Sequence, residues 1–118
     1  MNLEPIADEL GLEHLTPALA APVTAELTAG YASDLLSDVL ANAPEGGVLV
    51  TLQVHLNVVA VASHAELAAV IFSSGRVPDA DVIAKAVAED LHLFTTDADT
   101  FEVVGRLWAL GVCSGRVA

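Results

Sequence analysis

The chain has 118 residues, which fits one domain large enough to bury its own core. Its 16 acidic residues against 4 lysines and arginines give a net charge of −12, which excludes nucleic acid and anionic membranes as partners. Hydrophobic residues make up 54% of the sequence, but no apolar run approaches the roughly 20 residues of a membrane span. No basic segment followed by an apolar stretch opens the chain, so we expect a cytoplasmic protein.

The first 22 residues predict a short helix followed by a connector. Asn2 is a suitable N-cap, the helix should run through Leu10, and Gly11 should end it. Residues 12–15 are compatible with a short strand, and an Ala/Pro connector follows over residues 17–22. The next strand is expected over residues 23–28, with Gly30 as its breaker.

A pair of aspartates marks the next predicted helix, which Ser33 can cap and Asn42 should end. Asp34 and Asp38 are spaced four apart and would be neighbours on the helix surface. With His55 they could bind a divalent cation, which would suit a metal-dependent hydrolase. The alternative that we favour is a solvated face, because aspartates in a first helical turn interact favourably with the helix dipole.

Short apolar runs follow a Pro-Glu-Gly-Gly turn at residues 44–47. Residues 48–52 and 56–62 are expected to be strands, and a third strand is expected at 69–73. In strand geometry His55 and Asn57 would point to one face. They would line a pocket or a subunit interface, or form an ordinary wet face.

The last third of the sequence alternates helix, strand and helix. A helix is expected from residue 78 to 90, a strand over 91–95, and a last helix that Thr96 or Asp97 caps and Leu110 ends. Phe101, Val104 and Trp108 share one face of this last helix. The alternation predicts a single-domain α/β fold with a mainly parallel β-sheet flanked by helices.

Two turns that follow predicted strands are the preferred place for a small ligand, because ligands gather at strand ends in open α/β sheets. The first turn contains Ser74 and Arg76, and the second contains Thr95 and Thr96. Phosphate-binding loops of the usual kinds and nucleophile elbows are missing from the sequence, so an enzyme is unsupported and no cofactor is expected.

The single cysteine limits metal chemistry further. Cys113 can form no disulfide within the chain and cannot make a four-sulfur metal site. We expect it to be a small apolar filler, and we expect no metal to be bound.

Several segments together resemble the DRTGG domain family from about Val23 to Gly111. They are ELTAGYASDLLSDVLANA, VTLQVHLNVVAVA and RVPDADVIAKAVAEDLHLFTTDADTFEVVGRLWALG. The family's naming motif is only partly kept, since Thr28 and Gly30 alone match it. The resemblance divides the chain into an N-terminal helix and connector (1–22), a DRTGG-like α/β domain (23–112) and a mobile tail (113–118).

The resemblance implies a regulatory role and pairing of the domain with itself. Domains of this kind occur beside phosphate acetyltransferase domains, between nucleotide-binding CBS domains of some pyrophosphatases, and near genes for iron hydrogenases. No catalytic residue carries over from the family. We therefore expect a non-catalytic regulatory or interaction module that forms a homodimer and serves a redox, hydrogenase or acetyl-phosphate-related enzyme. A nucleotide-like small-molecule sensor using His55, Asn57 and the strand-end turns is the alternative.

Overall fold

The computed structural model describes residues 2–19 and 26–115, which contain five helices and five strands. In chain order these elements are α1 (Leu3–Leu10), β1 (Glu13–His14), β2 (Gly30–Ala32), α2 (Leu36–Asn42), β3 (Val48–Thr51), α3 (Asn57–His64), β4 (Ala69–Phe72), α4 (Ala80–Ala88), β5 (His92–Thr95) and α5 (Thr100–Ala109). The α/β class and the single domain expected from the sequence are confirmed. Among the described residues, no helix is long and apolar enough to cross a membrane.

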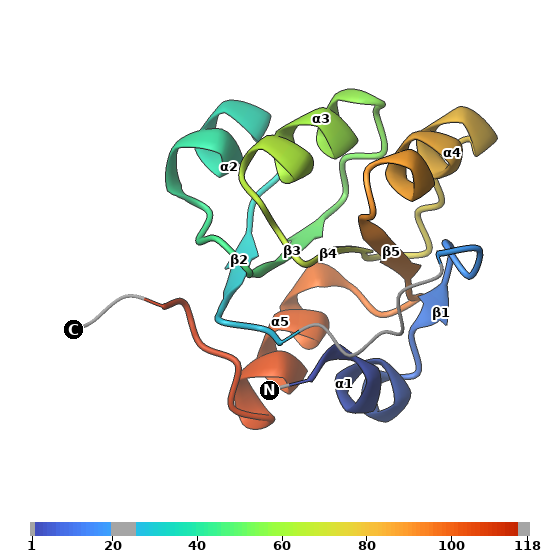
Figure 1. Cartoon of the computed structure of the whole chain (residues 1–118). Helices are drawn as coiled ribbons and strands as arrows, with labels where there is room; N and C mark the ends of the chain where they lie inside the picture. The colour runs from blue at the N-terminus through green and yellow to red at the C-terminus, as the bar shows by residue number, and fades with distance from the viewer. Residues whose placement is uncertain (1, 20–25, 116–118) are drawn as a thin grey trace.

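One five-stranded sheet, in the order β1-β5-β4-β3-β2, forms the centre of the molecule. Strands β2 to β5 are parallel, and only β1 runs antiparallel, beside β5. Each of α2, α3 and α4 joins a strand to its next neighbour in the same direction, so all three lie on one face of the sheet (Figure 1). After β5 the chain passes to the opposite face, where α5 and α1 lie (Figure 1).

The central strands are buried on both faces, which explains their unbroken apolar sequences. In β3, Val48 and Val50 join the core with α1 and α5, whereas Leu49 joins the core with α2, α3 and α4. In β4, Ile71 and Phe72 divide in the same way between the two cores. The alternation of side chains along each strand therefore supplies two hydrophobic layers from one short run.

The strand expected over residues 56–62 is wrong, because residues 57–64 form helix α3. Strands β3 and β4 are parallel neighbours, and such strands need a crossover connection of about a dozen or more residues, usually with a helix. The buried side chains of α3, Val58, Val59 and Ala62, follow helical spacing. Thr51, Gln53, His55 and Asn57 therefore do not form one strand face.

The strand expected over residues 23–28 lies partly outside the described residues, and residues 26–28 contribute only a bridge between Glu26 and Asn2. Strand β2 instead begins at Gly30, the residue that was expected to break a strand. The Gly30 N–H donates to the Cys113 carbonyl oxygen at 2.7 Å. A Cβ at this position would come within 3.3 Å of Val112, so glycine lets the segment after α5 pack closely against β2.

Helix ends depart from the expected caps in two places. Helix α2 begins at Leu36 because the Ser33 hydroxyl accepts from the Leu35 N–H at 3.2 Å, which forms a turn ahead of the helix. Helix α5 is capped by Asp99, whose carboxylate accepts from the Glu102 N–H at 2.9 Å. The predicted stop at Gly11 is confirmed by its left-handed backbone, with φ of 66°.

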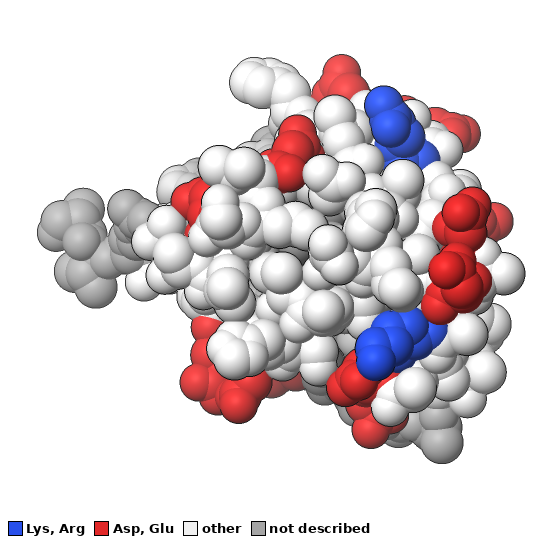
Figure 2. All heavy atoms as spheres, turned by 90° about the horizontal axis from the view of Figure 1, so that it is seen from above, with Lys and Arg blue, Asp and Glu red and all other residues white. Residues whose placement is uncertain are grey.

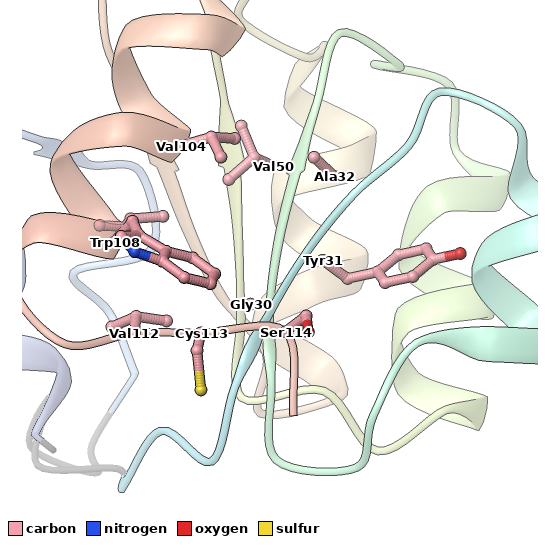
Figure 3. Close-up of a pocket in the computed structure, with 10 residues that line it drawn as sticks. Gly30, Tyr31, Ala32, Val50, Val104, Trp108, Val112, Cys113 and Ser114 are labelled. Atoms are coloured by element: carbon pink, nitrogen blue, oxygen red, sulfur yellow. The ribbon is translucent and has the colours of Figure 1, made fainter. Parts of the chain in front are cut away.

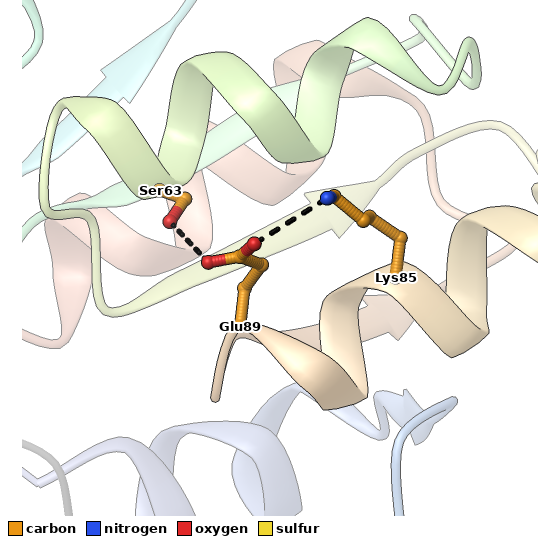
Figure 4. Close-up of polar contacts among 3 residues, drawn as sticks. All are labelled: Ser63, Lys85 and Glu89. Atoms are coloured by element: carbon orange, nitrogen blue, oxygen red, sulfur yellow. Dashed lines mark hydrogen bonds and ion pairs between the residues drawn. The ribbon is translucent and has the colours of Figure 1, made fainter.

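Acidic side chains lie around the rim of the face that α2, α3 and α4 cover, and the centre of this face is uncharged (Figure 2). Helix α3, which contains no Asp, Glu, Lys or Arg, runs across that centre. At its edge the Ser63 hydroxyl donates to Glu89 at 3.2 Å, and Glu89 also pairs with Lys85 at 3.5 Å (Figure 4). These contacts fasten the end of α3 to α4 with partly exposed groups, so each adds well under about 1 kcal/mol.

Candidate functional site

The carboxyl edge of the parallel sheet brings most of the predicted site residues to one end of the molecule, because parallel strands end at the same edge. Asp34 follows β2, His55 and Asn57 follow β3, and Asp38 lies within α2. Ser74 and Arg76 belong to the turn after β4, Thr95 is the last residue of β5, and Thr96 begins the turn that follows β5.

Asp34 fastens the loop after β2 to the end of β3. One carboxylate oxygen accepts from the Thr51 hydroxyl at 3.0 Å and from the Leu52 N–H at 2.7 Å. The Gln53 side-chain amide donates to the Asp34 carbonyl oxygen at 3.4 Å. Asp34 precedes α2, so the expected helical face shared by Asp34 and Asp38 is wrong. The carboxylate instead closes a turn at the sheet edge.

Asp38 has its own partners within the layer of α2. Its Oδ1 accepts from the Tyr31 hydroxyl at 2.8 Å and from the Asn42 side-chain amide at 2.9 Å. Within the described part of the chain, no group of three or more His, Cys, Asp or Glu side chains could hold a metal ion. The arrangement of Asp34, Asp38 and His55 that a metal-dependent hydrolase would need is therefore not formed.

His55 and Asn57 lie on the loop and first turn that lead into α3. The Asn57 N–H donates to Nδ1 of His55 at 3.1 Å, so the imidazole satisfies one of the N–H groups left open at the start of this helix. Both side chains are exposed, and neither lines the cavities described below. This geometry gives His55 a local structural role.

The turns after β4 and β5 are hydrogen-bonded to each other. Two backbone bonds and one side-chain bond join them: Ser74 N–H to Ala98 O (2.7 Å), Gly75 N–H to Thr96 O (2.8 Å) and Thr95 Oγ1 to Arg76 O (2.7 Å). The buried Ser73 hydroxyl also lies 2.6 Å from the hydroxyl of Thr100, at the start of α5. These bonds fill the place between neighbouring strand ends where an α/β sheet usually opens a crevice.

A polar hollow of about 220 Å³ remains beside these turns. It is lined by Gly11, Glu13, Gly75, Val77, Thr95, Thr96 and Asp97. Two of the predicted residues, Thr95 and Thr96, belong to this lining, whereas Ser74 and Arg76 do not. The two carboxylates, Glu13 and Asp97, favour a neutral or cationic group over an anion in this hollow.

An apolar cavity of about 190 Å³ lies between α5, strand β2 and the segment after α5 (Figure 3). It is lined by Gly30, Tyr31, Ala32, Val50, Val104, Leu107, Trp108, Val112, Cys113 and Ser114. Cys113 is exposed here and is not the buried filler expected from the sequence. The sequence pattern does not reveal this cavity, because its walls come from strands β2 and β3, helix α5 and the segment after α5, which are distant along the chain.

A second feature that sequence reasoning missed is a pair of histidines on β1 and β5. Nε2 of His14 lies 3.2 Å from Nδ1 of His92 and 3.0 Å from the hydroxyl of Thr16, which accepts from the Leu93 N–H at 3.2 Å. The His14 ring stacks on Phe94, with centroids 4.9 Å apart. Burial lowers the pKa of both histidines, and the neighbouring charge of His14 lowers the pKa of His92 further.

Comparisons with known proteins bear on the fold alone. No protein-family model matches the sequence, and a search of curated proteins finds no match. Among solved structures the chain is similar, with a TM-score of 0.74 and 16% sequence identity, to the CBS and DRTGG domains of the regulatory region of Clostridium perfringens pyrophosphatase, complexed with its activator diadenosine tetraphosphate. The similarity covers 97% of this chain and 48% of that one, so the chain shares a fold with about half of a regulatory region.

Proposed function

We propose that this domain is a non-catalytic regulatory or protein-interaction module of the DRTGG type that works as a homodimer in the cytoplasm. Its further partner is an enzyme of a redox, hydrogenase or acetyl-phosphate-related system. The observation that carries the proposal is a contrast between two surfaces. The turns after β4 and β5, where ligands usually bind, are joined by internal hydrogen bonds and leave a polar hollow only beside them, whereas Phe101 and Trp108 on α5 are 90% and 64% exposed.

The polar side chains that a catalytic site would use support this reading. The carboxylate of Asp34 and the hydroxyl of Thr95 both bond the protein's own backbone, and Asp38 bonds the side chains of Tyr31 and Asn42. Groups engaged in this way are held in place for structure rather than presented to a substrate. The fold similarity to a regulatory region of a pyrophosphatase agrees with a regulatory role.

Light scattering and a thermal-shift screen together test the proposal. We expect twice the 12.1 kDa of one chain in light scattering at micromolar concentrations. We expect no stabilisation by nucleotides, acyl phosphates, nicotinamide compounds or divalent metals. A ligand at 100 times its dissociation constant would add about 2.7 kcal/mol, a rise in Tm on the order of 10 °C for a domain of this size. A monomer would refute the homodimer, and such a rise in Tm would refute a purely protein-binding role.

A small-molecule sensor is the second candidate function. It is favoured by the polar hollow that Thr95 and Thr96 line, and by the nucleotide activator bound to the structurally similar pyrophosphatase region. Because Glu13 and Asp97 disfavour an anion in this hollow, uncharged adenosine is the first probe for the thermal-shift screen, and diadenosine tetraphosphate is the anionic comparison. Stabilisation that Thr96→Val removes, and that His55→Ala leaves unchanged, would make the hollow a sensor site. Stabilisation that His55→Ala removes would move the site to the β3–α3 loop.

A further inference from the structure

Helix α5 presents an apolar face to solvent. Its buried residues, Val103 and Leu107, face the sheet, while Phe101 is 90%, Val104 37% and Trp108 64% exposed. Positions i, i+3 and i+7 lie on one side of a helix, so these three side chains form a continuous row. Together with Gly105 at i+4 we call this row the α5 stripe.

Gly105 has no role within the described structure. Its φ is not positive, and a Cβ added to it would meet nothing within 4 Å. A glycine in the middle of a helix destabilises that helix by roughly 0.5–1 kcal/mol relative to alanine, and no close packing within the described residues requires a glycine at this position. The distance between packed helices depends on the side chains at their contact, and a glycine there allows a close approach.

The apolar cavity adjoins the α5 stripe, since Val104 and Trp108 belong to both. In Figure 3 Trp108, Val112 and Cys113 lie together beside β2, and Tyr31 is directed away from them. An apolar cavity of about 150 Å³ is large enough to bind benzene. The cavity beside α5 has a volume of about 190 Å³, which is enough for one phenyl ring. The stripe therefore combines a projecting aromatic side chain, Phe101, with a cavity that accepts one.

We infer that the α5 stripe is the homodimer interface, with Phe101 of each copy seated in the apolar cavity of the other. If a two-fold axis passes between Val104 and Gly105, two α5 helices run antiparallel and Phe101 meets the partner subunit's Trp108. Trp108 lies at the C-terminal end of α5, and this end of the helix borders the cavity. In an isologous contact the same surface of both subunits is self-complementary. A protruding side chain and a cavity on opposite sides of the two-fold axis meet this requirement.

Area and charge favour a second copy as the occupant. An aromatic side chain carries about 150–250 Å² of surface, so the exposed parts of Phe101 and Trp108 amount to roughly 300 Å². That is more than a third of the about 800 Å² that each partner of a standard interface buries. The stripe contains no charged residue, so two copies with a net charge of −12 can meet there with little local repulsion.

The test combines sedimentation equilibrium with the fluorescence of Trp108, the only tryptophan in the sequence. Because Phe101 is almost fully exposed, Phe101→Ala should leave the fold of the single chain intact. Leu35→Ala, which truncates another exposed side chain (64%) near α2, is the matched control. For Phe101→Ala we expect the dimer dissociation constant to rise on the order of a hundredfold or more, since two central aromatic contacts are lost at once.

Trp108 emission should shift to shorter wavelength as the wild-type protein associates, and it should stay at long wavelength in Phe101→Ala. Gly105→Leu should block association while raising the thermal stability of the single chain, because leucine is a much better helix former than glycine. A protein that merely misfolds would not show these two changes in opposite directions.

This inference rests on the proposed homodimer, and the measurements separate the two. A wild-type monomer at every concentration overturns both. A dimer that Phe101→Ala and Gly105→Leu leave intact, with Trp108 emission independent of concentration, overturns the α5 interface and keeps the homodimer. Loss of the dimer in Leu35→Ala alone would likewise move the interface to the α2 side.

Discussion

Replacing Thr51 with valine tests whether Asp34 has a structural role at the sheet edge. Thr51 is fully buried at the end of β3, and valine keeps its shape while removing the hydroxyl. Two hydrogen bonds are lost: the donation to the Asp34 carboxylate at 3.0 Å and the acceptance from the Gln53 N–H at 3.1 Å.

A hydrogen bond to a charged group contributes about 1.5–3 kcal/mol, and a neutral one about 0.5–1.5 kcal/mol. Asp34 is exposed, so water can replace part of the hydrogen bonding that its carboxylate loses in the variant. We therefore expect Thr51→Val to lower the free energy of unfolding by about 1–2 kcal/mol. For 118 residues each kcal/mol corresponds to roughly 4 °C, so the fall in Tm should be about 4–8 °C.

Urea unfolding followed by far-UV circular dichroism measures this loss, and Asp34→Ala completes a double-mutant cycle. The two single effects should not add, because both variants remove the same bond. Additive effects, or a loss under about 0.5 kcal/mol for Thr51→Val, would refute the structural role and return Asp34 to the candidates for ligand binding.

Three further predictions concern stability. The pKa values of His14 and His92 are lowered in the folded state, so stability should be complete above the unfolded value of about 6.5 and should fall as the pH drops below it. Urea titrations at several pH values measure this fall, and a slope unchanged in a His14→Gln/His92→Gln variant would contradict it. Gly11→Ala should lose about 1 kcal/mol from the left-handed backbone alone, with a smaller loss for Gly11→Asn; equal losses would show that this backbone is not the cause. Phe72→Ala should lose about 3–5 kcal/mol because Phe72 is fully buried, whereas Phe101→Ala, measured at concentrations where the chain is monomeric, should change stability by less than about 0.5 kcal/mol. A small loss at Phe72 would mean that the surrounding core collapses to fill the space.

The spacing of apolar residues predicted the strands well where both faces of the strand are buried. It predicted the structure poorly where only one side of the element is buried. Strands β3, β4 and β5 were expected almost at their observed ends, because each is a short apolar run next to a turn. Helix α3 was assigned to a strand because its valines favour strands locally. The need to connect two parallel neighbours overrode this preference, and that need becomes visible only when the pairing of β3 with β4 is known.

Ser74, Arg76, Thr95 and Thr96 were expected at strand ends and lie there, whereas the other four candidates were expected on a helix face or a strand face. The hydrogen-bond partners of these side chains could not be foreseen. Asp34 and Thr51 are 17 residues apart in sequence, and spacing alone does not reveal their bond. The face of α5 shows the same limit. Phe101, Val104 and Trp108 were correctly put on one face, but only the position of Val103 and Leu107 against the sheet shows which face is exposed.

The antiparallel pairing of β1 with β5 has a consequence for how the chain folds during synthesis. His14 meets His92 across 78 residues of sequence, and Arg106 of α5 reaches back to the Glu9 carbonyl oxygen at 2.9 Å. At about 5–20 residues per second, a ribosome needs roughly 4–16 s to make that intervening segment. For those seconds the apolar side of α1, with Leu3, Ile6 and Leu10, lacks the part of its core that β5 and α5 supply. Pairing of β1 with β5 and packing of α1 on α5 must therefore wait for the last third of this sequence, and this long-range closure should be the slow step in folding.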